Sequence, residues 1–197
     1  GPMRIKGLRV GVPKQFFDDA LDGEIDACVR GAIARMERAG AHIVELDLPW
    51  LEAALAIYYI VMPAEVSSNM NRYDGVTYGH VTQGDTLAKQ VVATRRDGFG
   101  DEVIRRILLG TFVLSSGYVD AYYKRAVAAQ RALRAQLDEA FGRVDVIVGP
   151  TSPTVAWPIG EKFDAPLIMY LSDIYTVVAN LAGAPALSVP CGMAHDL

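Results

Sequence analysis

Residues 8–49 read LRVGVPKQFFDDALDGEIDACVRGAIARMERAGAHIVELDLP, and this stretch decides the fold. Apolar residues over 8–12 predict a short buried strand that ends at Pro13, because proline cannot donate to a strand ladder. Over residues 24–39 the apolar positions recur every three or four residues, which predicts a helix with one buried face. Asp22 is a typical N-cap for this helix, and Gly40 is a typical glycine after its end. Alternating apolar residues over 44–48 predict a second strand, which Pro49 ends.

The order strand, helix, strand predicts two parallel strands in one sheet, because such a crossover returns the chain in the same direction. Beyond it we expect helices over residues 50–71, 101–114, 118–141 and 172–181, with a kink or interruption at Pro63. Strands are expected over 144–148 and 186–189, and residues 73–100 are rich in turn residues. The sequence therefore predicts an α/β fold with a mixed, mostly parallel sheet flanked by helices.

Composition excludes several classes of protein. The chain has 197 residues, of which 51% are hydrophobic, so it is not intrinsically disordered. The formal charge of −4 argues against a protein whose main task is to bind nucleic-acid phosphates. No apolar stretch reaches the roughly 20 residues of a membrane helix. The two cysteines, Cys28 and Cys191, cannot form a disulfide framework and favour a reducing, cytoplasmic setting.

A search for catalytic motifs finds none of the common ones. The sequence has no GxSxG elbow, HExxH helix, Walker loop or GxGxxG turn, and no cysteine and histidine cluster that indicates zinc. We expect His42, His80 and His195 to have structural or surface roles. The hydroxyl pairs Ser67-Ser68, Ser115-Ser116 and Thr151-Ser152 lack an adjacent base, so we expect caps or packing hydroxyls. Motifs alone indicate an α/β segment of unknown function.

Short blocks spread over nearly the whole chain carry a family resemblance. They include PAEVSSN at 63–69, RYDG at 72–75, GFG at 98–100, RRI at 105–107, SSGY at 115–118, NLAG at 180–183 and SVPCG at 188–192. In this order and spacing they resemble the amidase-signature family, and within it the glutamine-hydrolysing A subunits of tRNA-dependent amidotransferases. The region over residues 81–93 resembles it least.

The resemblance implies that the catalytic groups lie elsewhere. The family uses a serine, a cis-serine and a lysine, carried in a glycine- and serine-rich region upstream of the part resembled here. These 197 residues contain no such run. We therefore expect a segment truncated at both ends that is inactive by itself. Gly1, Pro2 and Met3 resemble the remnant of a cleaved tag, and residues 4–197 are expected to form a single α/β segment. A natural split protein is the alternative.

The resemblance also implies a glutamine-binding site made of Arg106, Asp173 and Tyr58. A guanidinium suits the α-carboxylate of glutamine, because two parallel hydrogen bonds join them, and a carboxylate suits the α-ammonium. By likeness, Arg106 binds the carboxylate, Asp173 accepts from the ammonium and Tyr58 lines the pocket. The residues alone leave other roles open: an exposed helix face for Arg106, a charge on the helix dipole for Asp173 and core packing for Tyr58.

The implied activity is a glutaminase that supplies ammonia for the amidation of misacylated Glu-tRNA(Gln) or Asp-tRNA(Asn). The implied partners are the B and C subunits of the amidotransferase, with ATP, magnesium and most tRNA contacts on the B subunit, and no cofactor or metal in this chain. Two alternatives stay open: another amidase-signature hydrolase acting on small or aryl amides, and a non-enzymatic interaction fragment. We also expect self-association, because apolar residues form a stripe from Tyr118 to Phe141.

Overall fold

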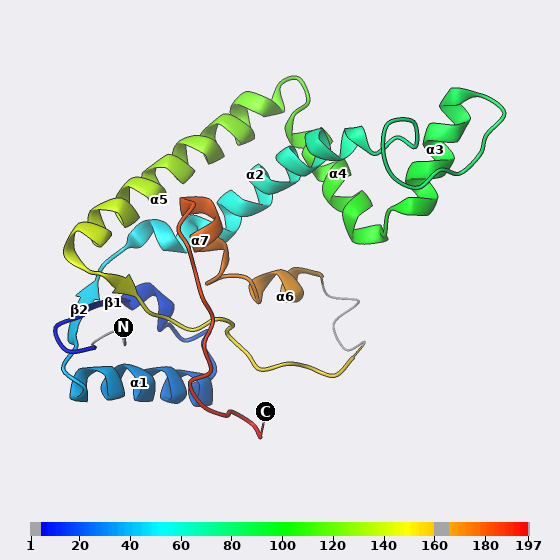
Figure 1. The fold of residues 1–197 in the computed structure, drawn as a ribbon. Helices are drawn as coiled ribbons and strands as arrows, with labels where there is room; N and C mark the ends of the chain where they lie inside the picture. Colours follow the sequence, from blue (N-terminus) through cyan, green and yellow to red (C-terminus); the bar gives the residue numbers. More distant parts are fainter. Residues whose placement is uncertain (1–4, 160–165, 197) are drawn as a thin grey trace. The chain divides into compact units, whose positions relative to one another are not determined.

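The computed structural model describes residues 5–159 and 166–196, and its contacts divide the chain into two compact units (Figure 1). The sheet unit comprises Gly1–Leu55 and Ala129–Leu197, and the helical unit comprises Ala56–Ala128. The chain passes between the units inside two helices, α2 (Ala54–Asn69) and α5 (Lys124–Arg143). The prediction of a single segment over residues 4–197 stays a prediction.

A three-stranded parallel sheet forms the centre of the sheet unit. Its strands are β1 (Arg9–Pro13), β2 (His42–Leu46) and β3 (Val146–Ile147), in the spatial order β2-β1-β3. In the register of β1 and β2, Arg9 lies opposite His42 and Pro13 opposite Leu46. The parallel pair confirms the predicted strand-helix-strand unit, and the α/β fold class is confirmed with it. β3 is shorter than the strand expected over residues 144–148.

Helix α1 (Gly23–Arg38) connects β1 to β2 and has the predicted ends. The Asp22 carboxylate accepts hydrogen bonds from the backbone N–H groups of Glu24, at 2.9 Å, and Ile25, at 3.2 Å, so it satisfies two donors that a helix start leaves open. Gly40 has φ +97°, a left-handed conformation that glycine adopts without strain. Both observations confirm the predicted caps.

Helices cover the two faces of the sheet (Figure 1). α1 lies along one face, and the later turns of α5 lie on the other side with α7 (Val177–Ala182). The core between these layers contains fully buried apolar side chains, among them Val10, Leu46, Leu133 and Val144. α5 and α7 are joined by a hydrogen bond of 3.0 Å from Gln130 Nε2 to the Leu181 carbonyl.

A C-terminal strap, residues 191–196, runs along α1. Arg35 Nη2 donates to the Cys191 carbonyl at 2.9 Å, and Cys28 Sγ donates to the Met193 carbonyl at 3.3 Å. The backbone N–H of His195 donates to Glu24 Oε2 at 2.7 Å. These contacts attach the strap to three turns of one helix.

The helical unit contains most of α2, then α3 (Leu87–Gly98), α4 (Asp101–Val113) and a π-helical turn, η4 (Val119–Tyr123), that leads into α5. Short 3₁₀ turns flank α2 at Pro49–Ala53 and Met70–Arg72. Pro63 does not interrupt α2, which includes it as an interior residue. None of the helices among the described residues is long and apolar enough to cross a membrane.

Three sequence-based predictions are wrong in detail. α3 lies in the region predicted as turns, and the Thr86 hydroxyl caps it by accepting from the Lys89 backbone N–H at 3.3 Å. The helix expected over residues 172–181 is replaced by α6 (Pro166–Leu171), a series of turns and α7. Residues 186–189 have no strand partner among the described residues, and Leu187 is 88% exposed.

Candidate functional site

Arg106 lies on α4 with its side chain directed against neighbouring groups of the helical unit. Its side chain is 23% exposed, whereas that of the adjacent Arg105 is 47% exposed. Nε of Arg106 donates to Oε1 of Glu102 at 2.7 Å, and Glu102 also pairs with Arg105. The spacings of four and three residues place both arginines within reach of Glu102 on one side of the helix. Arg106 is therefore not part of a fully solvated helix face.

Residues of α2 complete the surroundings of this guanidinium. Nη1 of Arg106 contacts Met62 Sδ at 3.5 Å, and its Cζ lies 5.8 Å from the centre of the Tyr59 ring, within the range of a cation–π contact. Tyr58 also interacts with Arg106 and contributes to raising its pKa. The rings of Tyr58 and Tyr59 meet edge to face with centroids 5.2 Å apart. The structure thus brings together Arg106 and Tyr58, two of the three residues that the resemblance singles out.

The charge of Arg106 is maintained in this environment. Burial opposes ionisation and by itself lowers the pKa of Arg106, but hydrogen bonds to Glu102 and Tyr58 and the charge of Glu102 outweigh it, so the pKa is raised above its ordinary value. A guanidinium can bind a carboxylate through two parallel hydrogen bonds, and Arg106 already pairs with one carboxylate, that of Glu102.

A close approach of two helices fixes this arrangement. Gly110, one turn after Arg106 on α4, is buried against α2. A Cβ atom at Gly110 would lie 1.9 Å from the Pro63 carbonyl oxygen and 2.7 Å from Ser67 Cβ. Only a glycine permits this contact, so Gly110 sets the spacing between the helix that carries Arg106 and the helix that carries Tyr58.

Asp173 belongs to the sheet unit and lies in the turns between α6 and α7. It is half-buried, and its backbone carbonyl accepts from the Val177 N–H at 3.1 Å and the Thr176 hydroxyl at 3.2 Å. The backbone of Asp173 is therefore fixed by local hydrogen bonds at the start of α7. Its role as the ammonium acceptor stays a prediction.

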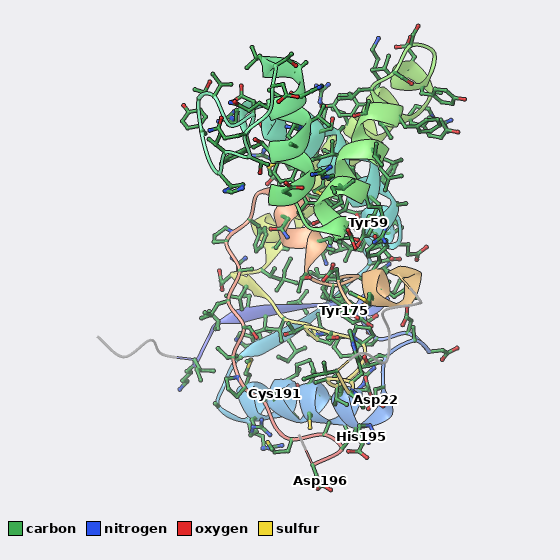
Figure 2. The ribbon with its side chains drawn as sticks, turned by 90° about the vertical axis from the view of Figure 1, so that its right-hand side faces the viewer. Asp22, Tyr59, Tyr175, Cys191, His195 and Asp196 are labelled. Atoms are coloured by element: carbon green, nitrogen blue, oxygen red, sulfur yellow. The ribbon has the colours of Figure 1, made fainter. Side chains whose placement is uncertain are left out.

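Tyr175, two residues after Asp173, has no sequence pattern that singles it out. It is 6% exposed, and its hydroxyl has no hydrogen-bond partner among the described residues. Burial, together with the charge of Asp18, raises the pKa of Tyr175 to about 12. The phenol is thus a neutral donor at physiological pH. Its ring packs edge to face on Phe16 with centroids 5.4 Å apart, and Figure 2 shows it inside the molecule.

Three other polar groups considered from the sequence have local partners: Ser67, Ser115 and His80. Ser67 Oγ contacts the Ala64 carbonyl at 3.2 Å and Ser115 Oγ the Phe112 carbonyl at 2.7 Å, as expected of packing hydroxyls. His80 Nε2 and Thr82 Oγ1 are 3.0 Å apart. An open cavity of about 290 Å³ in the helical unit is lined by Ala64, Glu65, Ser68, Asn69, Leu114 and Tyr123. Among the described residues, no group of three or more His, Cys, Asp or Glu could hold a metal ion.

Comparisons with known proteins agree with one another. A family model described as Amidase matches residues 3–196. The chain is 50% identical over 194 residues to the A subunit of glutamyl-tRNA(Gln) amidotransferase from Caldanaerobacter subterraneus subsp. tengcongensis, a match that covers 98% of this chain and 40% of the relative. It is 49% identical over 193 residues to the protein of the same name from Chloroflexus aggregans, with the same coverage of 98% and 40%. The chain thus spans about two fifths of the length of these relatives.

Solved structures show the same similarity in three dimensions. The crystal structure of the glutamyl-tRNA(Gln) amidotransferase A subunit from Thermotoga maritima matches with a TM-score of 0.71 and 34% identity, over 98% of this chain and 37% of that one. A bacterial aryl acylamidase of the amidase-signature enzymes matches with a TM-score of 0.67 at 15% identity, over 98% of this chain and 38% of that one, which shows a shared fold.

Proposed function

Because the chain belongs to the amidase family, we propose that it is the substrate-recognition part of a glutamine-hydrolysing subunit. Relatives about half identical in sequence are named as the A subunit of glutamyl-tRNA(Gln) amidotransferase, which supports this choice within the family. The observation that carries the proposal is the half-buried Arg106 guanidinium, held by Glu102, Met62 and Tyr58. An amidase for uncharged amides requires no cation that binds a substrate carboxylate.

Glutamine has an α-carboxylate and an α-ammonium on one carbon, so its recognition requires a cation and an anion. In the proposal Arg106 binds the carboxylate, Tyr58 lines the same part of the pocket and Asp173 accepts from the ammonium. These charges distinguish glutamine from amides that share only its reacting group, because a buried charge left without its partner is strongly unfavourable.

The chemical step uses groups outside these residues. A serine Oγ attacks the side-chain amide carbon of glutamine, the carbon–nitrogen bond breaks, and ammonia leaves after taking up a proton. Water then hydrolyses the glutamyl ester and releases glutamate and the free serine. The family's serine, cis-serine and lysine perform this work, and backbone donors stabilise the oxyanion. We therefore expect the 197-residue chain alone to release no ammonia from glutamine.

The ammonia serves the amidation of Glu-tRNA(Gln) or Asp-tRNA(Asn) on a partner. In the proposal this chain associates with the B and C subunits in the cytoplasm, and the B subunit holds ATP, magnesium and most of the tRNA. The acidic balance of the chain, a formal charge of −4, supports an arrangement in which another subunit contacts most of the tRNA phosphates.

The test measures ammonia release by the full-length protein within its complex, with glutamine and with a small amide that has no α-charges. Arg106→Ala should lower kcat/KM for glutamine by about 30- to 1000-fold, or about 2–4 kcal/mol, since a charge-assisted contact is lost and a carboxylate is left unpaired. Hydrolysis of the uncharged amide should stay nearly unchanged. Arg106→Lys should restore only part of the activity, because an ammonium lacks the planar fork, and Asp173→Asn should cause a loss similar to that of Arg106→Ala.

The matched control is Arg96→Ala, which removes an arginine of the same unit that is 72% exposed and paired with Asp97. This variant should retain activity on both substrates. Equal losses on both substrates in Arg106→Ala would make Arg106 a structural residue and would favour an amidase-signature hydrolase of another specificity.

A further inference from the structure

We propose that Glu102 is a positioning residue that determines how Arg106 meets the substrate. The inference rests on the proposed function, since it concerns the same carboxylate contact. Glu102 and Arg106 lie four residues apart on α4, and Nε of Arg106 donates to Oε1 of Glu102 at 2.7 Å. Glu102 touches no substrate atom in this proposal, so it acts through the arginine.

The contact at Nε selects one of two binding geometries. A guanidinium can meet a carboxylate side-on, through Nε and one terminal nitrogen, or end-on, through both terminal nitrogens. Because Nε donates to Glu102, a bidentate contact with the substrate uses the end-on geometry. The Met62 thioether that contacts Nη1 at 3.5 Å is a weak acceptor, so a substrate carboxylate readily replaces it.

Two arginines of α4 share the carboxylate of Glu102. Glu102 pairs with Arg105 as well as with Arg106, so one carboxylate lies between two guanidinium groups and the three side chains have a net positive charge. Arg105 and Glu102 are 47% and 42% exposed, whereas Arg106 is 23% exposed. Arg106 is thus the least exposed of the three side chains, and Glu102 contacts it from a more solvated position.

A fixed arginine binds with less loss of conformational freedom. An unrestrained arginine side chain has many rotamers, and ordering them opposes binding. Here the Glu102 contact, the Met62 contact and the Tyr59 ring restrict the guanidinium before the substrate arrives. Since this preparation affects binding and leaves the attacking serine unchanged, the loss of Glu102 should raise KM and leave kcat nearly constant.

The experiment compares Glu102 variants of the full-length protein in its complex, with glutamine and with the uncharged amide. Glu102→Gln keeps an acceptor but removes its charge, and it should raise KM for glutamine about five-fold, with kcat within a factor of two. Glu102→Ala removes the acceptor as well and should raise KM further, to about ten-fold or more. Neither variant should alter hydrolysis of the uncharged amide. In an Arg106→Ala background, Glu102→Gln should have no additional effect, because the group it positions is gone.

The control is Asp85→Asn, which breaks another ion pair of the same spacing in the same unit, Lys89 Nζ to Asp85 Oδ2 at 3.1 Å. It should leave KM for glutamine unchanged. A normal KM in both Glu102 variants, alongside a large loss in Arg106→Ala, would overturn the positioning role and leave the proposed function intact. An equal loss on both substrates, or a loss that adds to that of Arg106→Ala, would also overturn it. No loss in Arg106→Ala would instead overturn the proposed function itself.

Discussion

The imidazole of His195 lies between two carboxylates at the start of α1, and Figure 2 shows it beside Asp22. Nε2 is 2.9 Å from Asp22 Oδ2, and Nδ1 is 3.4 Å from Glu24 Oε1. The hydrogen bond to Asp22 and the charges of Asp22, Glu24 and Asp196 raise the pKa of His195 above 6.5. The hydrogen bond from His195, with those from the backbone of Ile25 and Glu24, lowers the pKa of Asp22.

A pH dependence of the C-terminal strap follows from these shifts. The raised pKa of His195 gives a stabilisation that is fully present below about pH 6.5 and lost as the pH rises through the folded-state value. The lowered pKa of Asp22 gives a second stabilisation of the folded state. This stabilisation is present above about pH 4 and is lost as the pH falls through the pKa that Asp22 has in the folded state. A proton NMR titration of the 197-residue chain should place the pKa of His195 above 6.5, and Asp22→Asn should lower it. A pKa of His195 at or below 6.5 would contradict the contact with Asp22.

Single residues differ in how far the sequence could place them. Asp22 and Gly40 could be assigned because a cap acts through its immediate neighbours, and those neighbours are adjacent in the sequence. The contact between Arg106 and Tyr58 is different, since α4 and α2 must pack before the two side chains meet. Glu102 was missed as a partner of Arg106, although its spacing of four residues on a predicted helix could have indicated it.

At the scale of helices, the close approach of α2 and α4 is sensitive to substitution at Gly110. Gly110→Ala would introduce a Cβ 1.9 Å from the backbone oxygen of Pro63, and the backbone cannot rotate away as a side chain could. The two helices must separate, at a cost of about 1–3 kcal/mol in the free energy of unfolding. Because Arg106 lies one turn away on α4, KM for glutamine should rise as well. Denaturant unfolding and glutamine kinetics of the full-length protein measure the two effects.

Gly142→Ala is the matched control for this substitution. Gly142 lies in α5, and a Cβ there would meet nothing within 4 Å. Alanine should be neutral or stabilising by up to about 1 kcal/mol, as expected of helix propensity alone. If Gly110→Ala behaved like Gly142→Ala, the close approach of α2 and α4 would not hold in solution.

A helix or strand could be predicted from the sequence where its start, its apolar pattern and its end were all marked by nearby residues. α1 has a cap, one apolar face and a terminal glycine, and its predicted bounds differ from the observed Gly23–Arg38 by one residue at each end. The sequence did not predict α3 because glycines and aspartates, which are typical of turns, lie near both of its ends. Thr86 caps this helix, but the apolar periodicity that usually follows a helix cap is absent from the residues after it. Residues 186–189 have the apolar residues of a strand, but a strand exists only through pairing, and its partner cannot be identified from local sequence.

At the scale of the whole molecule, exposed apolar side chains gather in the helical unit. Leu108 and Phe112 lie four residues apart on α4 and are 64% and 51% exposed. The ring centroids of Phe112 and Tyr118 lie 4.4 Å apart, and the ring of Tyr118 stacks on that of Tyr122 with centroids 5.8 Å apart. Tyr118 is 40% exposed and Tyr122 is 46% exposed. We call these four residues the aromatic patch. The stripe predicted from Tyr118 to Phe141 is thus divided, since Ala126, Leu133 and Leu137 within it are buried.

The aromatic patch should cause the 197-residue chain to self-associate, because contiguous apolar surface exposed to water favours burial against another molecule. Light scattering over a range of protein concentrations should show a mass that rises above the 21.3 kDa of one chain. Phe112→Glu combined with Leu108→Glu should reduce the association, since two charges would then have to be desolvated at the contact. Val92→Glu is the control, because Val92 lies on α3, outside the patch, and is 66% exposed. A monodisperse monomer at high concentration would contradict the prediction, and an equal decrease in mass with Val92→Glu would show that association does not use this patch.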